Sequence, residues 1–115
     1  MLPSVMALDV YVVDGARRDP AAGFPSCAFD DRDHDFIFHG AGIDIYNRYP
    51  FLRRMIDFYA DAKYSSDVLD SLIAEIDEVM PQISSVKSAV ESMQSFRDVC
   101  VSARDAGKSL FLFCD

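Results

Sequence analysis

The feature that most constrains this chain is a helical pattern that leads directly into a strand near the C-terminal end. From residue 83 onward, apolar residues recur every three or four positions and so share one helix face: Ile83, Val86, Val90, Met93, Phe96, Cys100 and Ala103. Gly107 follows, where a residue with positive φ commonly ends a helix. The short apolar run 110–114 then predicts a buried strand, so the earlier elements must pack on this helix and this strand.

Length and composition predict a single domain over residues 1–115. Half of the 115 residues are apolar, and a chain of this length buries about two thirds of its unfolded surface. No apolar run approaches the ~20 residues that span a bilayer. The first residues carry no basic leader and include Asp9, which is not typical of a signal peptide. Cys27, Cys100 and Cys114 lack the spacing of a disulfide framework, so we expect a reducing, cytoplasmic location.

Several short strands are expected before the C-terminal elements. Apolar and β-branched residues alternate at period two over residues 8–13 and predict a strand. Two aromatic stretches, 24–29 and 35–39, flank a run of Asp residues and predict a hairpin with an acidic tip. Residues 43–46 are compatible with one more short strand.

Two further helices are expected in the middle of the chain. Asn47 is a plausible cap for a helix that runs to about Lys63. Ser65 or Ser66 would cap the next helix, whose apolar stripe stops at Pro81. The predicted fold is an α+β domain with a sheet of four to five strands packed against three helices, in the order β-β-β-(β)-α-α-α-β.

The net charge of −8 indicates which partners the protein can have. Nineteen acidic residues, sixteen of them Asp, face eleven Lys and Arg residues. The acids concentrate in residues 1–46 and in residues 65–80, where five acids occur without a base. Such a field repels nucleic acids and anionic membranes, and it accelerates the encounter with a basic protein. We therefore expect a basic protein partner, no nucleic acid and no membrane.

The candidate partner-binding residues are carboxylates from these two acidic blocks, together with one tyrosine. One group lies on the expected hairpin tip. The other lies on the helix opposite its apolar stripe, without the mixed signs that usually stabilise an exposed face. Tyr46, Tyr49 and Tyr64 lie near element ends, where an exposed ring can anchor an interface. The selected set is Asp30, Asp31, Asp33, Asp35, Asp67, Asp70, Glu75, Asp77, Glu78 and Tyr64. An ordinary solvated helix face stays the alternative interpretation.

Motifs for metal binding or catalysis are incomplete. Residues 31–35 alternate carboxylates like the first half of a calcium loop, but Phe36 stands where that loop needs glycine. His34, His39 and Cys27 lack the fourth ligand and the close cysteine pair of a typical zinc site. No local sequence marks a cysteine as an activated nucleophile. We expect no catalytic residues, no metal and no cofactor.

The C-terminal third resembles a known class of proteins. It combines the apolar spacing of residues 95–103, the sequence Gly107-Lys108-Ser109-Leu110 and an apolar strand that ends on Asp115. In these features it is similar to immunity proteins of bacterial polymorphic toxins, most nearly those of contact-dependent growth inhibition systems. The resemblance implies a protein that binds a cognate toxin domain, often a basic nuclease, and blocks its active site or substrate groove.

The expected function is therefore neutralisation of a toxin through an acidic, partly aromatic surface. Two alternatives from other classes stay open. One is a non-catalytic structural module that forms a homo-oligomer. The other is a small enzyme that uses Asp, His or Cys in a cleft, which a pocket gathering His34 or His39 with a cysteine or paired carboxylates would favour.

Overall fold

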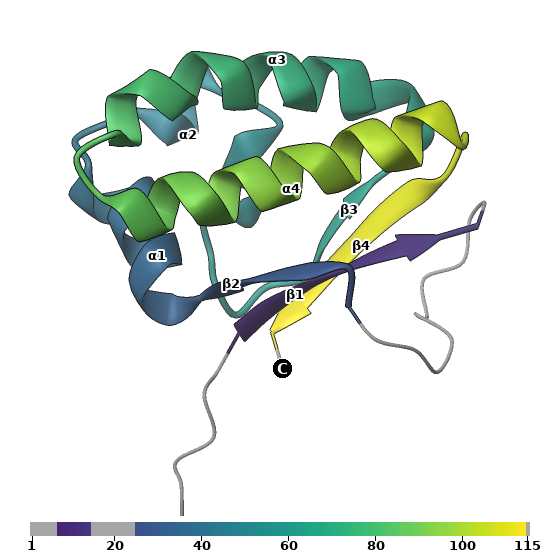
Figure 1. The fold of residues 1–115 in the computed structure, drawn as a ribbon, viewed down its shortest axis with the longest axis horizontal. Helices are drawn as coiled ribbons and strands as arrows, with labels where there is room; N and C mark the ends of the chain where they lie inside the picture. The colour runs from purple at the N-terminus through teal and green to yellow at the C-terminus, as the bar shows by residue number, and fades with distance from the viewer. Residues whose placement is uncertain (1–6, 15–24, 115) are drawn as a thin grey trace, which may run out of the picture.

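One antiparallel sheet organises the described part of the chain, residues 7–14 and 25–114 of a computed structural model (Figure 1). Its strands follow the order β2-β1-β4-β3, with β1 at Ala7–Val13, β2 at Cys27–Asp30, β3 at Ala62–Tyr64 and β4 at Ser109–Cys114. The central pair is the longest, with Leu8 opposite Cys114 and Val13 opposite Ser109. The α+β class and a sheet of four strands are confirmed.

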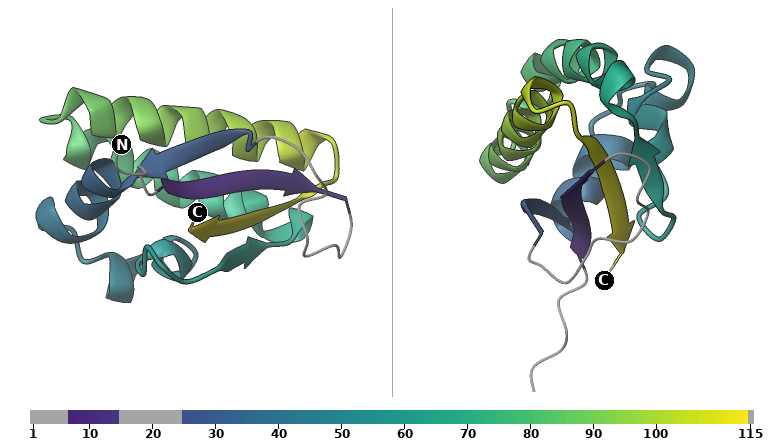
Figure 2. Two further views of the ribbon diagram at one scale, coloured as in Figure 1. Left: turned by 90° about the horizontal axis from the view of Figure 1, so that it is seen from below. Right: turned by 90° about the vertical axis from the view of Figure 1, so that its right-hand side faces the viewer.

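Helices cover one face of this sheet (Figure 2). The long helix α4, Lys87–Asp105, packs on the strands, and α3, Leu69–Val79, packs beside it. The shorter helical elements are α1 at Asp31–Asp35, the π-helical turn η1 at Phe36–Gly40, α2 at Ile45–Arg48, and the 3-10 turns η2 at Leu52–Met55, η3 at Ser66–Val68 and η4 at Met80–Ile83. Among the described residues, no helix has the length and apolar character to cross a membrane.

The C-terminal helix and strand form as the sequence predicts. The face of α4 that contains Met93 and Phe96 is fully buried, and Phe96 meets Phe29 of β2 edge to face at 5.3 Å between ring centroids. Gly107 ends the helix with φ +67°, and the N–H of Lys108 donates to the carbonyl of Ala103 at 2.8 Å. This bond satisfies a carbonyl at the helix end, which is why a glycine with positive φ is suited to this position.

The predicted hairpin is wrong in its second half. Strand β2 exists, although residue 24 lies outside the described residues, but residues 31–40 are helical where a tip and a second strand were expected. Asp30 caps this helical segment, because its Oδ1 accepts the N–H of Asp33 at 2.7 Å. The buried residues in it are Asp33, His34, Ile37 and Phe38. That spacing is helical, so the acidic run forms a helix N-terminus.

The strand expected at 43–46 and the helix expected from Asn47 to Lys63 are also wrong. Asp44 caps the one-turn helix α2, and Tyr49 leaves the helical region with φ −129°, as residues before a proline commonly do. Two distant side chains then hold the turn that follows: Glu75 accepts the N–H of Leu52 at 2.8 Å, and the Tyr64 hydroxyl donates to the Phe51 carbonyl at 2.6 Å. Strand β3 therefore occupies the end of the expected helix, and the order of elements in the middle of the chain differs from the predicted one.

Candidate functional site

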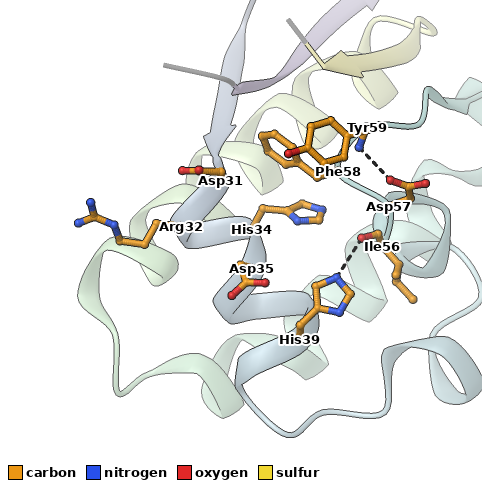
Figure 3. Close-up of a pocket in the computed structure, with 9 residues that line it drawn as sticks. All are labelled: Asp31, Arg32, His34, Asp35, His39, Ile56, Asp57, Phe58 and Tyr59. Carbon is orange, nitrogen blue, oxygen red and sulfur yellow. Dashed lines mark hydrogen bonds between the residues drawn. The ribbon is translucent and has the colours of Figure 1, made fainter. Parts of the chain in front are cut away.

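An open pocket lies between the α1–η1 segment and the residues that follow η2 (Figure 3). Its volume is about 750 Å³, within the range of small-ligand sites in proteins. The residues that line it are Asp31, Arg32, His34, Asp35, His39, Ile56, Asp57, Phe58 and Tyr59. The pocket therefore combines two histidines, three carboxylates and two aromatic rings.

Helical spacing explains why one wall of the pocket is rich in ionisable groups. Asp31 and Asp35 are four residues apart, so both lie on the same side of α1. His39 follows four residues later, within the π-helical turn. In the close-up, His34 and His39 extend toward the segment 56–59, whereas Arg32 extends away from the histidines (Figure 3). One short helical segment thus supplies most of the charged groups of the site.

Both histidines bind consecutive backbone carbonyls at the end of η2. The Nε2 of His34 lies 2.5 Å from the Met55 oxygen, and the Nε2 of His39 lies 3.3 Å from the Ile56 oxygen. Because a carbonyl only accepts hydrogen bonds, each Nε2 donates, and the neutral rings carry their proton there. The contacts fix the orientation of both imidazoles and leave each Nδ1 as the atom that takes up a second proton.

His34 lies in a largely apolar environment. It is 1% exposed and packs against Phe38 at 4.5 Å and against Phe58 at 5.1 Å between ring centroids. This burial lowers the pKa of His34 below its ordinary value of 6.5, although the Met55 carbonyl and the nearby carboxylates of Asp35 and Asp57 oppose the shift. His34 is therefore neutral at neutral pH.

Three carboxylates at the rim of the pocket have no cationic partner among the described residues. Asp31, Asp35 and Asp57 are exposed, and none of them forms a salt bridge with a described residue. Asp57 accepts the N–H of Tyr59 at 3.0 Å. The Tyr59 side chain is 68% exposed and stands edge-on to Phe58. The rim thus offers negative charge beside an accessible aromatic ring.

The four predicted carboxylates of the acidic run divide into two pairs. Asp30 caps α1 through Asp33, and Asp33 itself is only 6% exposed. The two oxygens of Asp33 accept hydrogen bonds from the hydroxyls of Ser88 and Ser92 on α4, each at 2.7 Å. Asp33 therefore anchors α1 to α4 and Asp30 caps α1, whereas Asp31 and Asp35 line the pocket.

Most of the predicted acids on α3 pair with arginines of neighbouring helices. Asp77 binds the Arg97 Nε at 2.5 Å, and Asp70 binds Arg104 at 2.9 Å. The hydrogen bond from Arg97 lowers the pKa of the Asp77 carboxyl. Glu78 lies 3.9 Å from Arg48. The acidic face of α3 is therefore largely neutralised within the protein.

The remaining predicted site residues also have internal partners. Asp67 accepts a hydrogen bond from the Ser65 hydroxyl, and Glu75 accepts the N–H groups of Phe51 and Leu52. Tyr64 is fully buried, so the prediction that it exposes an anchoring ring is wrong. Strand β3 places its ring in the core, where its hydroxyl reaches the Phe51 carbonyl.

Two of the three tyrosines expected near element ends are buried. Tyr49, like Tyr64, belongs to the core and is 2% exposed. Tyr46 is 63% exposed, with the Arg53 guanidinium 5.0 Å from its ring centroid. The sequence therefore did not distinguish the accessible tyrosines from the buried ones.

Sequence reasoning missed Asp57 and Tyr59. It placed both residues within a long helix, from Asn47 to about Lys63, that does not form, and it selected no carboxylate between residues 36 and 66. The available signal was the cluster Asp57-Phe58-Tyr59, which combines charge with aromatic rings. The cluster lies at the pocket because His34 and His39 contact the two backbone carbonyls just before it, and the sequence does not show these contacts.

Thiol and metal chemistry find no support at this pocket. Burial raises the pKa of the Cys27 and Cys100 thiols to about 12, which makes them poor nucleophiles, and neither residue lines the pocket. Within residues 7–14 and 25–114, no group of three His, Cys, Asp or Glu side chains is arranged to hold a metal ion.

Comparisons with known protein families, with curated proteins and with solved structures find no match for this chain.

Proposed function

We propose that this protein is an immunity protein that binds and neutralises a basic toxin domain in the cytoplasm, using the rim of the pocket as its contact surface. The observation that carries the proposal is a group of three carboxylates, Asp31, Asp35 and Asp57, that form no salt bridge with a described residue and lie around the exposed ring of Tyr59.

The chemistry of this rim suits a cationic protein surface. Carboxylates without internal partners pair with Lys or Arg side chains that, in a nuclease, otherwise hold the phosphates of the substrate. The net charge of −8 accelerates the encounter, because the field of the whole protein attracts a basic partner. An exposed tyrosine such as Tyr59 supplies apolar contact area, which prolongs the lifetime of a complex.

The proposal places the contact at the pocket and not on α3. A carboxylate that is already paired must give up its arginine before it can meet a partner, so Asp70 and Asp77 gain little from a new contact. Asp31 and Asp35 have no salt bridge to lose among the described residues. The α3 acids then contribute to the long-range field only.

Paired variants test this assignment, with a basic protein encoded by a neighbouring gene as the candidate toxin domain. Affinity is measured by calorimetry for Asp31→Asn with Asp35→Asn, and for Asp70→Asn with Asp77→Asn as the matched control that removes the same charge. The pocket pair is expected to weaken binding by about tenfold or more, and the α3 pair by less than about threefold.

Protection of cells that express the toxin domain supplies the functional readout, with the same ranking of the variants expected. Equal affinity of the pocket pair and the unsubstituted protein contradicts the proposed contact surface. Absence of both binding and protection contradicts the immunity function itself.

A second candidate function is a small acid–base enzyme, because the pocket gathers His34 and His39 with three carboxylates. In such an enzyme the exposed His39 would exchange a proton with a substrate through its Nδ1 atom. A panel of ester and phosphoester substrates tests this function. Turnover that is abolished by His39→Gln would favour the enzyme over the inhibitor, and no turnover is expected if the pocket serves only to bind.

A further inference from the structure

We infer that His34 and His39 make the pocket a pH-gated receptor for a cationic side chain of the partner. The cation binds while the imidazoles are neutral and is released when they take up protons. This inference rests on the proposed function, because it concerns the same pocket and the same kind of partner.

The two histidines line the same pocket as the carboxylates that would bind the cation. The ring centroids of His34 and His39 are 6.3 Å apart, and both rings line the pocket together with Asp31, Asp35 and Asp57. In the close-up, the Asp35 carboxylate lies near both rings, and Asp57 lies across from them (Figure 3). A guanidinium or ammonium group that pairs with these carboxylates therefore lies in the same pocket as both imidazoles.

The hydrogen bonds of the two rings decide where a proton goes. Each Nε2 already donates to a backbone carbonyl, of Met55 for His34 and of Ile56 for His39. A second proton must therefore bind Nδ1, and the ring gains a full positive charge without losing its orientation. The gate does not require any movement of the backbone.

Protonation of the imidazoles changes the net charge of the groups that line the pocket. The charged residues that line the pocket are Asp31, Arg32 and Asp35 on α1 and Asp57 after η2, where the phenol of Tyr59 also lies; of these, Arg32 extends away from the two rings (Figure 3). With neutral imidazoles, the three carboxylates and the one guanidinium leave an excess of two negative charges. Each imidazole that takes up a proton reduces that excess by one charge, so the attraction of the pocket for a cation weakens.

The two histidines contribute unequally. Burial lowers the pKa of His34, so this ring resists protonation, whereas His39 is exposed to solvent. For an effective dielectric constant of roughly 40 to 80, one positive charge at about 6 Å weakens the binding of a cation by about threefold to tenfold. His39 is therefore expected to account for most of the gate.

The test uses the full chain, isotope-labelled, and a tetra-arginine peptide as the probe. The dissociation constant is measured by amide NMR titration at about pH 7.5 and about pH 5.5, a range over which histidines change charge and ordinary carboxylates do not. The unsubstituted protein is expected to bind about threefold to tenfold more weakly at the lower pH. His39→Gln, which retains a donor for the Ile56 carbonyl, is expected to keep its affinity at the higher pH and to lose most of the decrease.

Two controls separate the gate from the pocket itself. Asp98→Asn removes an exposed carboxylate from α4, outside the pocket, and is expected to behave like the unsubstituted protein. Asp31→Asn with Asp35→Asn is expected to lose binding at both pH values. The dispersion of the amide spectrum shows in each sample that the protein is folded.

The outcomes distinguish the inference from the proposed function. Equal affinity at the two pH values, with binding still lost in the Asp31/Asp35 variant, overturns the gate and leaves the contact surface intact. A decrease that persists in full in His39→Gln also overturns it. Absence of binding at both pH values, or equal binding by the Asp31/Asp35 variant, overturns the contact surface and the gate together.

Discussion

Two regions of this molecule carry clusters of carboxylates, and they differ in what those carboxylates contact. On α3, Asp70 and Asp77 are held by Arg104 and Arg97 of the neighbouring helix. At the rim of the pocket, Asp31 and Asp35 form no salt bridge with any described residue. Acidic residues of similar density in the sequence thus differ in their availability to a partner, and a tertiary contact decides the difference.

Helix geometry explains the pairing on α3. Asp70 and Asp77 are seven residues apart, which is close to two helical turns, and Arg97 and Arg104 have the same spacing on α4. In the observed pairing, the earlier acid meets the later arginine, as expected for helices that run in opposite directions (Figure 1). The helical segment α1–η1 has no such partner for its exposed side, because its buried side is the one that meets α4.

The largest expected effect concerns the residue that holds the pocket helix in place. Asp33→Ala removes a buried carboxylate and leaves the hydroxyls of Ser88 and Ser92 without their acceptor. We expect the free energy of unfolding to fall by about 2–3 kcal/mol, because hydrogen bonds to a charged group are lost in a buried place. Chemical denaturation measures this change. Asp70→Ala on the exposed face of α3 is the control, and an equal loss in the two variants would contradict the comparison.

A smaller effect is expected at Glu75, the α3 carboxylate that accepts backbone N–H groups from the turn η2. Glu75 accepts the N–H groups of Phe51 and Leu52 and so caps the turn η2 from outside. Glu75→Ala is expected to lower the free energy of unfolding by about 1–2 kcal/mol, in the range of a lost helix cap. Glu75→Gln, which keeps one oxygen acceptor, should recover part of the loss. If both variants are as stable as the parent protein, the cap has no energetic role.

The sequence predicted those parts of the fold that depend on local signals. The periodicity of α4, the glycine at 107 and the apolar run of β4 are all contained within about thirty residues, and each was predicted correctly. Asp30 was misread because Asp favours both tight turns and helix N-caps. The choice between them depends on whether the following residues bury one helical face.

The middle of the chain was not predictable in the same way. Its turn is held by Glu75 and Tyr64, which lie 24 and 13 residues after Phe51 and carry no local signal for it. At the site, Asp31 and Asp35 belong to the selected set and line the pocket, whereas Tyr59 lines the pocket and was not selected. Its position depends on the contacts of His34 and His39 with backbone carbonyls, and no side-chain pattern reveals such contacts.

The two histidines differ in burial, and they are therefore expected to differ in how they make the stability of the protein depend on pH. Burial lowers the pKa of His34 from 6.5, so below about pH 6.5 the unfolded chain binds a proton that the folded chain does not yet bind. Stability therefore decreases as the pH falls below that value, until the folded ring also takes up its proton. Melting temperatures between about pH 7.5 and about pH 5 measure the decrease. His34→Gln is expected to flatten this dependence, whereas His39→Gln at the exposed position is expected to keep it.

The smallest expected effect is the most direct test of the idea that pairing decides availability. Arg97→Gln with Arg104→Gln removes the partners of Asp77 and Asp70 and leaves both carboxylates in place. If internal pairing is what keeps α3 from binding cations, the freed face should bind tetra-arginine about twofold to threefold more tightly than the parent protein, as expected for exposed charges. NMR shift changes should then appear on α3 in addition to the pocket.

The matched control for this last test is Arg53→Gln with Arg54→Gln, which makes the same change of net charge where no salt bridge to a described residue is lost. An equal gain in this control would mean that net charge alone decides the affinity. In that case the distinction between the paired acids of α3 and the unpaired acids of the pocket would have no consequence for binding. A gain confined to the Arg97/Arg104 variant, with shift changes on α3, would instead show that the arginines of α4 direct a cationic partner to the pocket by occupying the competing surface.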